Sequence, residues 1–317
     1  MPTVADAITR TKRLLNSNTR TELDALNGAL AATTTTTIRL AYQTDSIRAG
    51  SYISLFDPVN SPSVAPETMY VHSRNGEYAT VQRGVDGSNK HTWGDGTTIE
   101  VEPRFTDHQI FEAVKDAIRA IPNNLYAVSS AETSITTTAT AVNFDVSSTG
   151  FFHVLQATRS PKSKKERWVK ANVKIYRDMN TTDFASGWML AMQEELEKDV
   201  TVRVTYAHPF ITSTLNPNTD LVSTVKMGAE MQDIPSLGAA ATLMLAEESN
   251  RLDLHAMGDS RGDSALTAGD RARHSMLLQA QYDRRVSQEA RRLMAKYGLR
   301  TDSSVGATFP TTLHGHL

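Results

Sequence analysis

Residues 78–105, YATVQRGVDGSNKHTWGDGTTIEVEPRF, form the densest group of potentially reactive side chains in the sequence. Carboxylate, imidazole and guanidinium groups that converge on one point can carry out general acid–base chemistry. In this stretch they alternate with glycines, so the same residues could instead occupy turns between strands. The charged or titratable candidates are Arg83, Asp86, His91, Asp95, Glu100 and Arg104.

The spacing of these residues favours turns over an active site. Asp86-Gly87 and Asp95-Gly96 are dipeptides typical of tight turns. Glu100 and Glu102 are two residues apart and should share one face of a strand. Pro103-Arg104-Phe105 then forms a hinge into the helix that follows. We therefore predict a scaffold element here.

The rest of the sequence contains no convincing catalytic or metal-binding pattern, and we expect no catalytic residue, cofactor or metal. The nine histidines are scattered, without the H-x-x-x-H spacing of a helical zinc site. Nucleotide-binding loops and the G-x-S-x-G elbow do not occur. Gly258-Asp259-Ser260 and Arg261-Gly262-Asp263 match short hydrolase and integrin-binding motifs, but a loop between helices explains both. Glu194-Glu195 is the best carboxylate pair, and a solvated pair is the simpler interpretation.

Two basic clusters are candidates for contacts with an acidic partner. One lies in RSPKSKKERWVK, and it fits either a phosphate or acidic surface or a solvated loop that protects an edge strand. The other lies on the last predicted helix, where it fits a solvated face or docking against an acidic partner. The loop candidates are Lys162, Lys164, Lys165 and Arg167. The helix candidates are Arg284, Arg285, Arg291 and Arg292, mostly away from a predicted apolar stripe of Leu277, Ala280, Ala290, Leu293 and Met294.

The order of helical and strand patterns predicts an α+β fold. Isolated helices of this length are marginal in water, so N-terminal, central and C-terminal helices should form one helical core. A small antiparallel β module and a second, β-sandwich-like module are then inserted into that core. The predicted regions are N-terminal helices (1–32), the β module (33–105), a helix (106–122), the β-sandwich-like domain (123–213), C-terminal helices (214–298) and an extended tail (299–317). The first region includes a second helix over TELDALNGAL, and QEELEKD is expected to be a polar turn.

The composition is that of a folded, rather polar protein. The 317 residues have a formal net charge of -2, which does not indicate a nucleic-acid binder. The sequence has no cysteine, so disulfides and thiol chemistry are excluded. No apolar run reaches the ~18 residues that span a bilayer. The N-terminus lacks the apolar core of a secretory signal, so we expect a protein that is not exported.

Residues 79–122 resemble a module in structural proteins of tailed bacteriophages, notably those of actinobacterial hosts. In that family an R-G-x-x-G-[ST] turn is followed by a His, a Gly-rich turn and a strand, and a P-R-F segment opens a helix. The matching positions are Arg83, Gly84, Gly87, Ser88, His91, Gly94, Pro103, Arg104, Phe105, Ala113 and Asp116. Residues 32–55, 200–210, 233–251 and 271–298 are similar to the family's flanking segments in the same order. Asn89-Lys90 and Trp93 depart from its pattern.

The resemblance implies a head-to-tail adaptor (connector or neck protein) of a siphophage. Such proteins form a ring, commonly of twelve subunits, beneath the portal, and DNA passes through the channel without sequence-specific binding. The implied partners are further copies of the chain, the portal protein and downstream connector or tail terminator proteins, but no membrane. The implied location is the virion neck, after assembly in the host cytoplasm.

The resemblance also implies roles for particular residues. A C-terminal segment of adaptors often docks on the portal, so residues 270–317 are candidates for that contact. The docking candidates are Arg284, Arg285, Arg291, Arg292, Phe309 and Leu313. The candidates for turns, or for braces of turns or of a neighbouring subunit, are Arg83, Gly84, Gly87, Pro103, Arg104 and Phe105.

Three alternatives remain open from the sequence. A tail-completion or tail-tube-associated protein is a neighbouring structural role. A carbohydrate- or receptor-binding virion protein would favour clustered exposed aromatic residues, whereas Trp93, Trp168 and Trp188 are far apart in the sequence. A virion hydrolase would need paired carboxylates, for which Glu194-Glu195 is the candidate.

Overall fold

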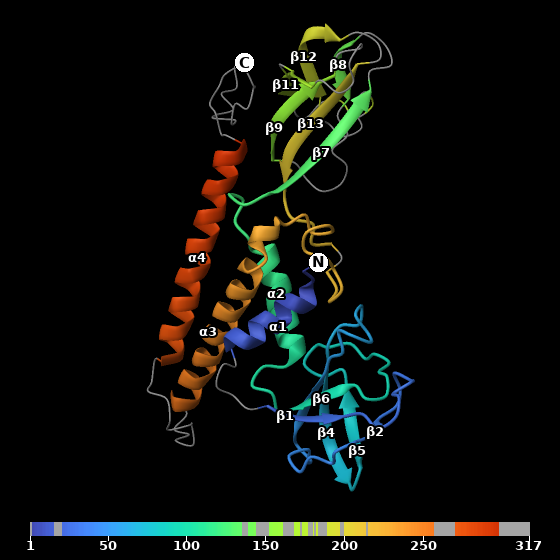
Figure 1. Cartoon of the computed structure of the whole chain (residues 1–317). Helices are drawn as coiled ribbons and strands as arrows, with labels where there is room; N and C mark the ends of the chain where they lie inside the picture. Colours follow the sequence, from blue (N-terminus) through green and yellow to red (C-terminus); the bar gives the residue numbers. More distant parts are fainter. Residues whose placement is uncertain are drawn as a thin grey trace. The chain divides into compact units, whose positions relative to one another are not determined.

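The computed structural model has an α+β fold, as the sequence predicts (Figure 1). The structure describes residues 2–15, 21–134, 139–143, 152–160, 168–171, 173–176, 180, 182, 189–196, 200–213, 215–256 and 270–297. The chain divides into two compact units. One contains residues 1–121 and 212–287, and the other contains residues 122–211 and 288–317.

Helices from distant parts of the sequence form the helical core of the first unit. α1 (Val4–Leu15), α2 (Asp107–Arg119) and α3 (Ile234–Ala256) pack against one another (Figure 1). Each buries apolar residues at helical spacing, such as Ile8 of α1 and Val114 of α2. Thr106 and Gln109 form a capping box that fixes the start of α2. The predicted core of N-terminal, central and C-terminal helices is confirmed.

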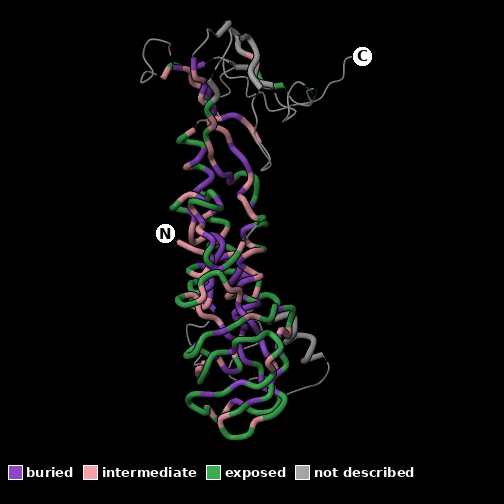
Figure 2. Tube along the Cα trace, turned by 90° about the vertical axis from the view of Figure 1, so that its right-hand side faces the viewer, coloured by how far each residue is buried: buried purple, intermediate pink, exposed green. Residues whose placement is uncertain are grey.

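A six-stranded antiparallel barrel is the β module of the first unit. Its strands are β1 (Glu22–Ala25), β2 (Thr37–Arg39), β3 (Tyr52–Leu55), β4 (Glu67–Asn75), β5 (Tyr78–Arg83) and β6 (Thr98–Val101), in the spatial order β1-β6-β3-β4-β5-β2. Hydrogen bonds between residues 25–27 and 39–41 join the two outer strands and close the sheet. Buried and exposed segments alternate along the barrel strands (Figure 2), and the buried side chains fill its interior.

Asp24 stabilises the closure between β1 and the segment after β2. Its carboxylate accepts main-chain N–H bonds from Ala25, Tyr42 and Thr44 at 2.7 to 2.9 Å. Burial acts to raise the pKa of Asp24, but these donors outweigh it and lower the pKa. The carboxylate therefore contributes stability at neutral pH that is lost as the pH falls through the lowered pKa.

We expect Asp24→Ala to lower the free energy of unfolding by about 1.5–3 kcal/mol at pH 7, because three partly buried main-chain N–H groups lose a charged acceptor. Urea denaturation at pH 7 and at pH values below the ordinary aspartate pKa measures this. The difference from the wild type should shrink on acidification. Asp45→Ala, at an exposed position, serves as the control and should change stability by less than about 0.5 kcal/mol.

The predicted second N-terminal helix is wrong. Residues 22–25 of TELDALNGAL form strand β1, which pairs with β6. Leu26 and Leu30 are buried in the barrel, while Leu23 is 56% exposed. The leucine spacing fitted a helix, but pairing with a strand more than 70 residues away in the sequence, from Glu22 to Val101, overrides it. The β module therefore begins before residue 33.

The second unit contains two antiparallel sheets, in keeping with the predicted β-sandwich-like module. The four-stranded sheet has the order β10-β9-β13-β7 and the three-stranded sheet the order β11-β12-β8. The strands are β7 (Ala127–Ser134), β8 (Ala139–Asn143), β9 (His153–Arg159), β10 (Val169–Lys170), β11 (Val173–Tyr176), β12 (Met189–Leu196) and β13 (Thr201–His208). β12 contains residues 193–196 of QEELEKD, so our prediction placed the start of the polar turn too early in the sequence.

The remaining elements are a 3-10 helix, η1 (Ala229–Met231), and the long helix α4 (Asp270–Tyr297). The part of α4 that belongs to the first unit lies along α3 (Figure 1), and the Ser275 hydroxyl donates to the Ala241 carbonyl at 2.9 Å. The division between the two units falls within α4, at residue 287. The predicted extended tail, residues 299–317, lies outside the described residues.

Candidate functional site

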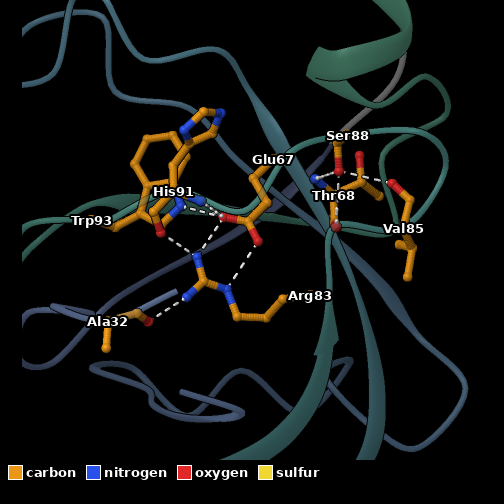
Figure 3. A network of polar contacts seen from close by, with 8 residues as sticks. All are labelled: Ala32, Glu67, Thr68, Arg83, Val85, Ser88, His91 and Trp93. Carbon is orange, nitrogen blue, oxygen red and sulfur yellow. Dashed lines mark hydrogen bonds and ion pairs between the residues drawn. The ribbon is translucent and has the colours of Figure 1, made fainter. Parts of the chain in front are cut away.

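The charged stretch of residues 78–105 directs its central arginine into the barrel. Arg83 lies on β5 and Glu67 at the start of β4, and their side chains are 1% and 0% exposed. The guanidinium donates to Glu67 Oε1 at 2.9 Å through Nε and to Oε2 at 2.6 Å through Nη2 (Figure 3). It also donates to the main-chain carbonyls of Ala32 and His91. Arg83 therefore ties two loops to the strand pair β4–β5.

Glu67 accepts hydrogen bonds from several neighbours. Its Oε2 atom also accepts the Trp93 indole N–H at 2.7 Å and the His91 main-chain N–H at 3.0 Å. Three of the four donors bind Oε2 and one binds Oε1, so all four hydrogen bonds seen on the carboxylate come from within the chain. Because its side chain is 0% exposed and paired with Arg83, the arrangement favours a structural role for Glu67. Its charge is neutralised by Arg83, which makes the pair a brace within the chain.

His91 contributes its main chain to this network, while its imidazole takes no part (Figure 3). Burial lowers the pKa of His91, and the nearby Arg83 charge lowers it further against the opposing effect of Glu67. The ring is therefore neutral at pH 7. It packs edge-on against Trp93, with ring centroids 6.1 Å apart. Bulk at position 93, where the resemblance shows a departure, is thus accommodated inside the barrel, since Trp93 is 2% exposed.

The turn after β5 has the backbone that its sequence predicts. Asp86 and Gly87 both have positive φ, and the Ser88 N–H donates to the Val85 carbonyl at 3.1 Å. The Ser88 hydroxyl accepts from the Thr68 N–H and donates to the Val85 carbonyl (Figure 3). Gly84 also has positive φ, and a Cβ atom there would lie 3.1 Å from the Ser88 carbonyl oxygen. At both predicted turn glycines, Gly84 and Gly87, a residue with a side chain would strain the backbone.

Arg104 braces the hinge between β6 and α2. Its guanidinium binds both carboxylate oxygens of Glu247 on α3, and Nη1 donates to the Leu15 carbonyl at the end of α1. Its guanidinium carbon lies 5.4 Å from the centroid of the Phe105 ring, which is buried. Pro103 is half-buried before it. The hinge residues therefore connect three helices to the end of the barrel.

A second charge network joins α1 to the same hinge. Lys12 Nζ lies 2.5 Å from Glu100 Oε1 and 2.6 Å from Asp107 Oδ1. Asp107 in turn accepts from the Ser54 hydroxyl at 3.1 Å. Glu100 is therefore a partly buried member of an ion cluster. Glu102 is exposed and follows the strand with positive φ, so the predicted shared strand face of Glu100 and Glu102 does not form.

Two of the four predicted docking arginines of α4 bind carboxylates within the chain, and the other two are exposed. Arg285 binds Asp233 at 2.7 and 3.0 Å and donates to the Glu230 carbonyl, and Arg292 binds Glu289 at 2.6 Å. Arg284 and Arg291 are exposed, and no ion pair of either is seen among the residues the structure describes. They are seven residues apart, and so they lie on the same side of the helix.

The predicted apolar stripe of α4 is wrong in part. Ala290 and Leu293 are buried, but Leu277 and Met294 are 57% and 43% exposed, and Ala280 is exposed. The buried stripe instead runs through Leu278 and Val286. The exposed face of α4, defined by Leu277, Ala280, Arg284, Arg291 and Met294, has the 3-4 spacing that packs against another helix.

Other candidates lie outside the described residues or serve the fold. Lys162, Lys164, Lys165, Arg167, Phe309 and Leu313 all fall outside the described residues. A surface hollow of about 550 Å³ beside β4 contains Arg74, but this guanidinium donates to the carbonyls of Gln43, Thr44, Ile47 and Gly76.

Within the described parts of the chain, no group of three or more His, Asp or Glu could hold a metal ion. The helices described here include none that is long and apolar enough to cross a membrane.

Sequence reasoning missed Glu67, the partner of Arg83. It begins strand β4, whose sequence ETMYVHSRN contains several other polar residues, so nothing local in the sequence marks it as the partner. No protein-family model matches the chain, and no curated protein matches it.

Proposed function

We propose that the protein is a non-enzymatic head-to-tail adaptor of a siphophage virion. Copies of the chain form a ring, most simply of twelve subunits, beneath the portal, and link the capsid vertex to downstream connector or tail terminator proteins. Double-stranded DNA passes through the ring without sequence-specific contacts. Assembly takes place in the host cytoplasm, and the mature location is the virion neck.

The exposed face of α4 carries this proposal. A helix normally turns its leucine and methionine side chains inward, yet Leu277 and Met294 are exposed beside the arginines Arg284 and Arg291. Apolar residues that alternate with cations fit a partner helix with apolar and acidic residues. A second α4 is a poor partner, because arginines would then face arginines. We therefore assign this face to an acidic surface of the portal.

The scaffold character of residues 78–105 supports the same role. Arg83 and Arg104, two of the residues by which the sequence resembles the adaptors, bind Glu67 and Glu247 within the chain. A tail-completion protein remains the second structural candidate. Both roles need an assembly surface, and the choice of partner distinguishes them.

We expect the purified chain to form a ring on its cognate portal, visible by negative-stain imaging and by native mass spectrometry. Arg284→Ala combined with Arg291→Ala should weaken portal binding about tenfold or more, since two charge pairs at an interface are lost. Arg48→Ala combined with Arg119→Ala removes two other exposed arginines and should leave binding unchanged. Binding to an isolated tail tube but not to the portal would favour the tail-completion role.

A further inference from the structure

A continuous aromatic surface lies on the outside of the barrel, where the structural roles above do not use it. Tyr52 of β3 and Tyr70 of β4 are direct cross-strand partners. Their neighbours Ile53 and Met69 are fully buried in the barrel, so by strand alternation both tyrosines point outward. Their rings meet edge to face with centroids 5.2 Å apart, and His72 packs on Tyr70 at the same distance. Tyr52 remains 48% exposed.

A carboxylate borders this surface. Glu102 follows β6, and its N–H donates to the Tyr52 carbonyl at 2.9 Å. Its side chain is exposed, as is the neutral Gln82, which pairs with Tyr70 across β4 and β5. Among the described residues, no arginine or lysine is paired with Glu102 or stacked on Tyr52 or Tyr70. The surface is therefore aromatic, and the residue next to Tyr52 at its edge is an exposed glutamate.

Contacts elsewhere in the chain indicate what an aromatic ring and a neighbouring carboxylate bind together. At two other places an aromatic ring next to a carboxylate is covered by an arginine. Arg39 lies over the Tyr78 ring at 5.9 Å and pairs with Glu77 at 3.0 Å. Arg203 lies over the Trp168 ring at 3.9 Å and pairs with Glu132 at 2.5 Å. In both cases the ring and the carboxylate hold one guanidinium between them.

We infer that the Tyr52–Tyr70–Glu102 surface binds arginine side chains of a second copy of this chain, and that Arg10 and Arg13 of α1 supply them. These two arginines are exposed and three residues apart, so they lie on one side of α1. No partner of either is seen in the part of the chain that the structure describes. A helix that presents two guanidinium groups matches a receptor of two rings and one carboxylate. The contact joins unlike surfaces, which is the kind that closes into rings.

This inference rests on the proposed ring and names its contact surfaces. A saccharide fits less well, because the two tyrosine rings are inclined by 61° and do not form a flat stacking platform. A phosphate ligand is disfavoured by the Glu102 charge. The occupant that both the charge and the ring geometry favour is a cationic side chain of a protein.

The test is assembly of the full chain, measured by light scattering after size exclusion and by native mass spectrometry, alone and with the portal. Tyr52→Ala, Glu102→Arg and Arg13→Glu should each weaken self-association about tenfold or more. Combining Glu102→Arg with Arg13→Glu in one chain should restore assembly, since the charges are exchanged across the contact. Tyr78→Ala is the matched control: it removes a tyrosine of similar exposure whose arginine lies in the same chain, and it should assemble normally.

The outcomes separate the inference from the proposed function. If the wild type forms rings and the single variants form them equally well, or the double variant is not rescued, this contact is wrong and the ring stands. If the wild type stays monomeric with and without the portal, both are wrong. Variants that assemble normally but lose binding on a glycan array would reassign the surface to a saccharide. Circular dichroism spectra and melting temperatures of all variants exclude misfolding as the cause, and Glu102→Gln gives a milder version of the same loss.

Discussion

Glu67→Ala is expected to lower the free energy of unfolding by about 3–5 kcal/mol, the largest effect of any single polar substitution in the barrel. The substitution leaves the Arg83 guanidinium, whose side chain is 1% exposed, without its carboxylate. The Trp93 indole N–H loses its acceptor at the same time. A buried charge and a buried donor without partners are among the few mechanisms that cost this much. Urea denaturation at pH 7 gives the value.

Two controls make this expectation specific. Glu77→Ala removes a carboxylate from a surface pair with Arg39, which is 45% exposed, and should cost less than about 1 kcal/mol. Replacing both members, Glu67→Gln with Arg83→Met, should recover much of the loss, because no unpaired charge is then left inside. A Glu67→Ala variant as stable as Glu77→Ala would show that the buried pair does not brace the barrel.

The Glu67–Arg83 pair also shows which features of the barrel the sequence could predict and which it could not. The turn at Asp86-Gly87, the start of α2 at Thr106 and the hinge at Arg104 follow from local chemistry, and each is found where it is expected. Glu67 could not be assigned to Arg83 from the sequence. They are 16 residues apart, and only the β4–β5 pairing brings them together.

The two wrong predictions, the apolar stripe of α4 and the helix over TELDALNGAL, also arise because distant contacts cannot be read from the sequence. In α4 the sequence offers two adjacent leucines, and the helical period alone does not say which of them is buried. Contact with α3, seen in the hydrogen bond from Ser275 to Ala241, turns Leu278 inward and Leu277 outward. In β1 a leucine spacing that suits a helix is overridden by a distant strand partner. Local pattern gives the existence of an amphipathic segment, and tertiary contacts decide which face is covered.

The arginines show the same difference between what a sequence pattern predicts and what tertiary contacts decide. Arg83, Arg104 and Arg285 each have a carboxylate partner within the chain, and each therefore serves the fold. Arg10, Arg13, Arg284 and Arg291 are exposed on α1 and α4, and these are the arginines to which we assign assembly contacts in our proposals. Sequence alone treats the two groups alike, because it does not show which carboxylates lie nearby.

Lys12→Met is expected to lower the free energy of unfolding by about 2–3 kcal/mol at pH 7, less than for a fully buried pair because Lys12 and Glu100 are each 21% exposed. Burial acts to lower the pKa of Lys12, but the charges of Asp107 and Glu100 outweigh it and raise the pKa. Lys12 is thus protonated at pH 7 and holds two carboxylates together. Removing it leaves Glu100 and Asp107 facing each other without a cation.

The pH dependence of this loss has a definite sign. Burial, together with the Asp107 charge, raises the pKa of Glu100 in the folded protein above its ordinary value. The folded state therefore holds the Glu100 proton more tightly than the unfolded state, and stability rises as the pH falls through that raised pKa. Without Lys12 the pKa is raised further. The Lys12→Met deficit should therefore be smaller at pH 5 than at pH 7 in urea denaturation, whereas Lys90→Met, at an exposed position, should show little deficit at either pH. A deficit that grows on acidification would mean that Glu100 stays charged and that the cluster is held by contacts other than Lys12.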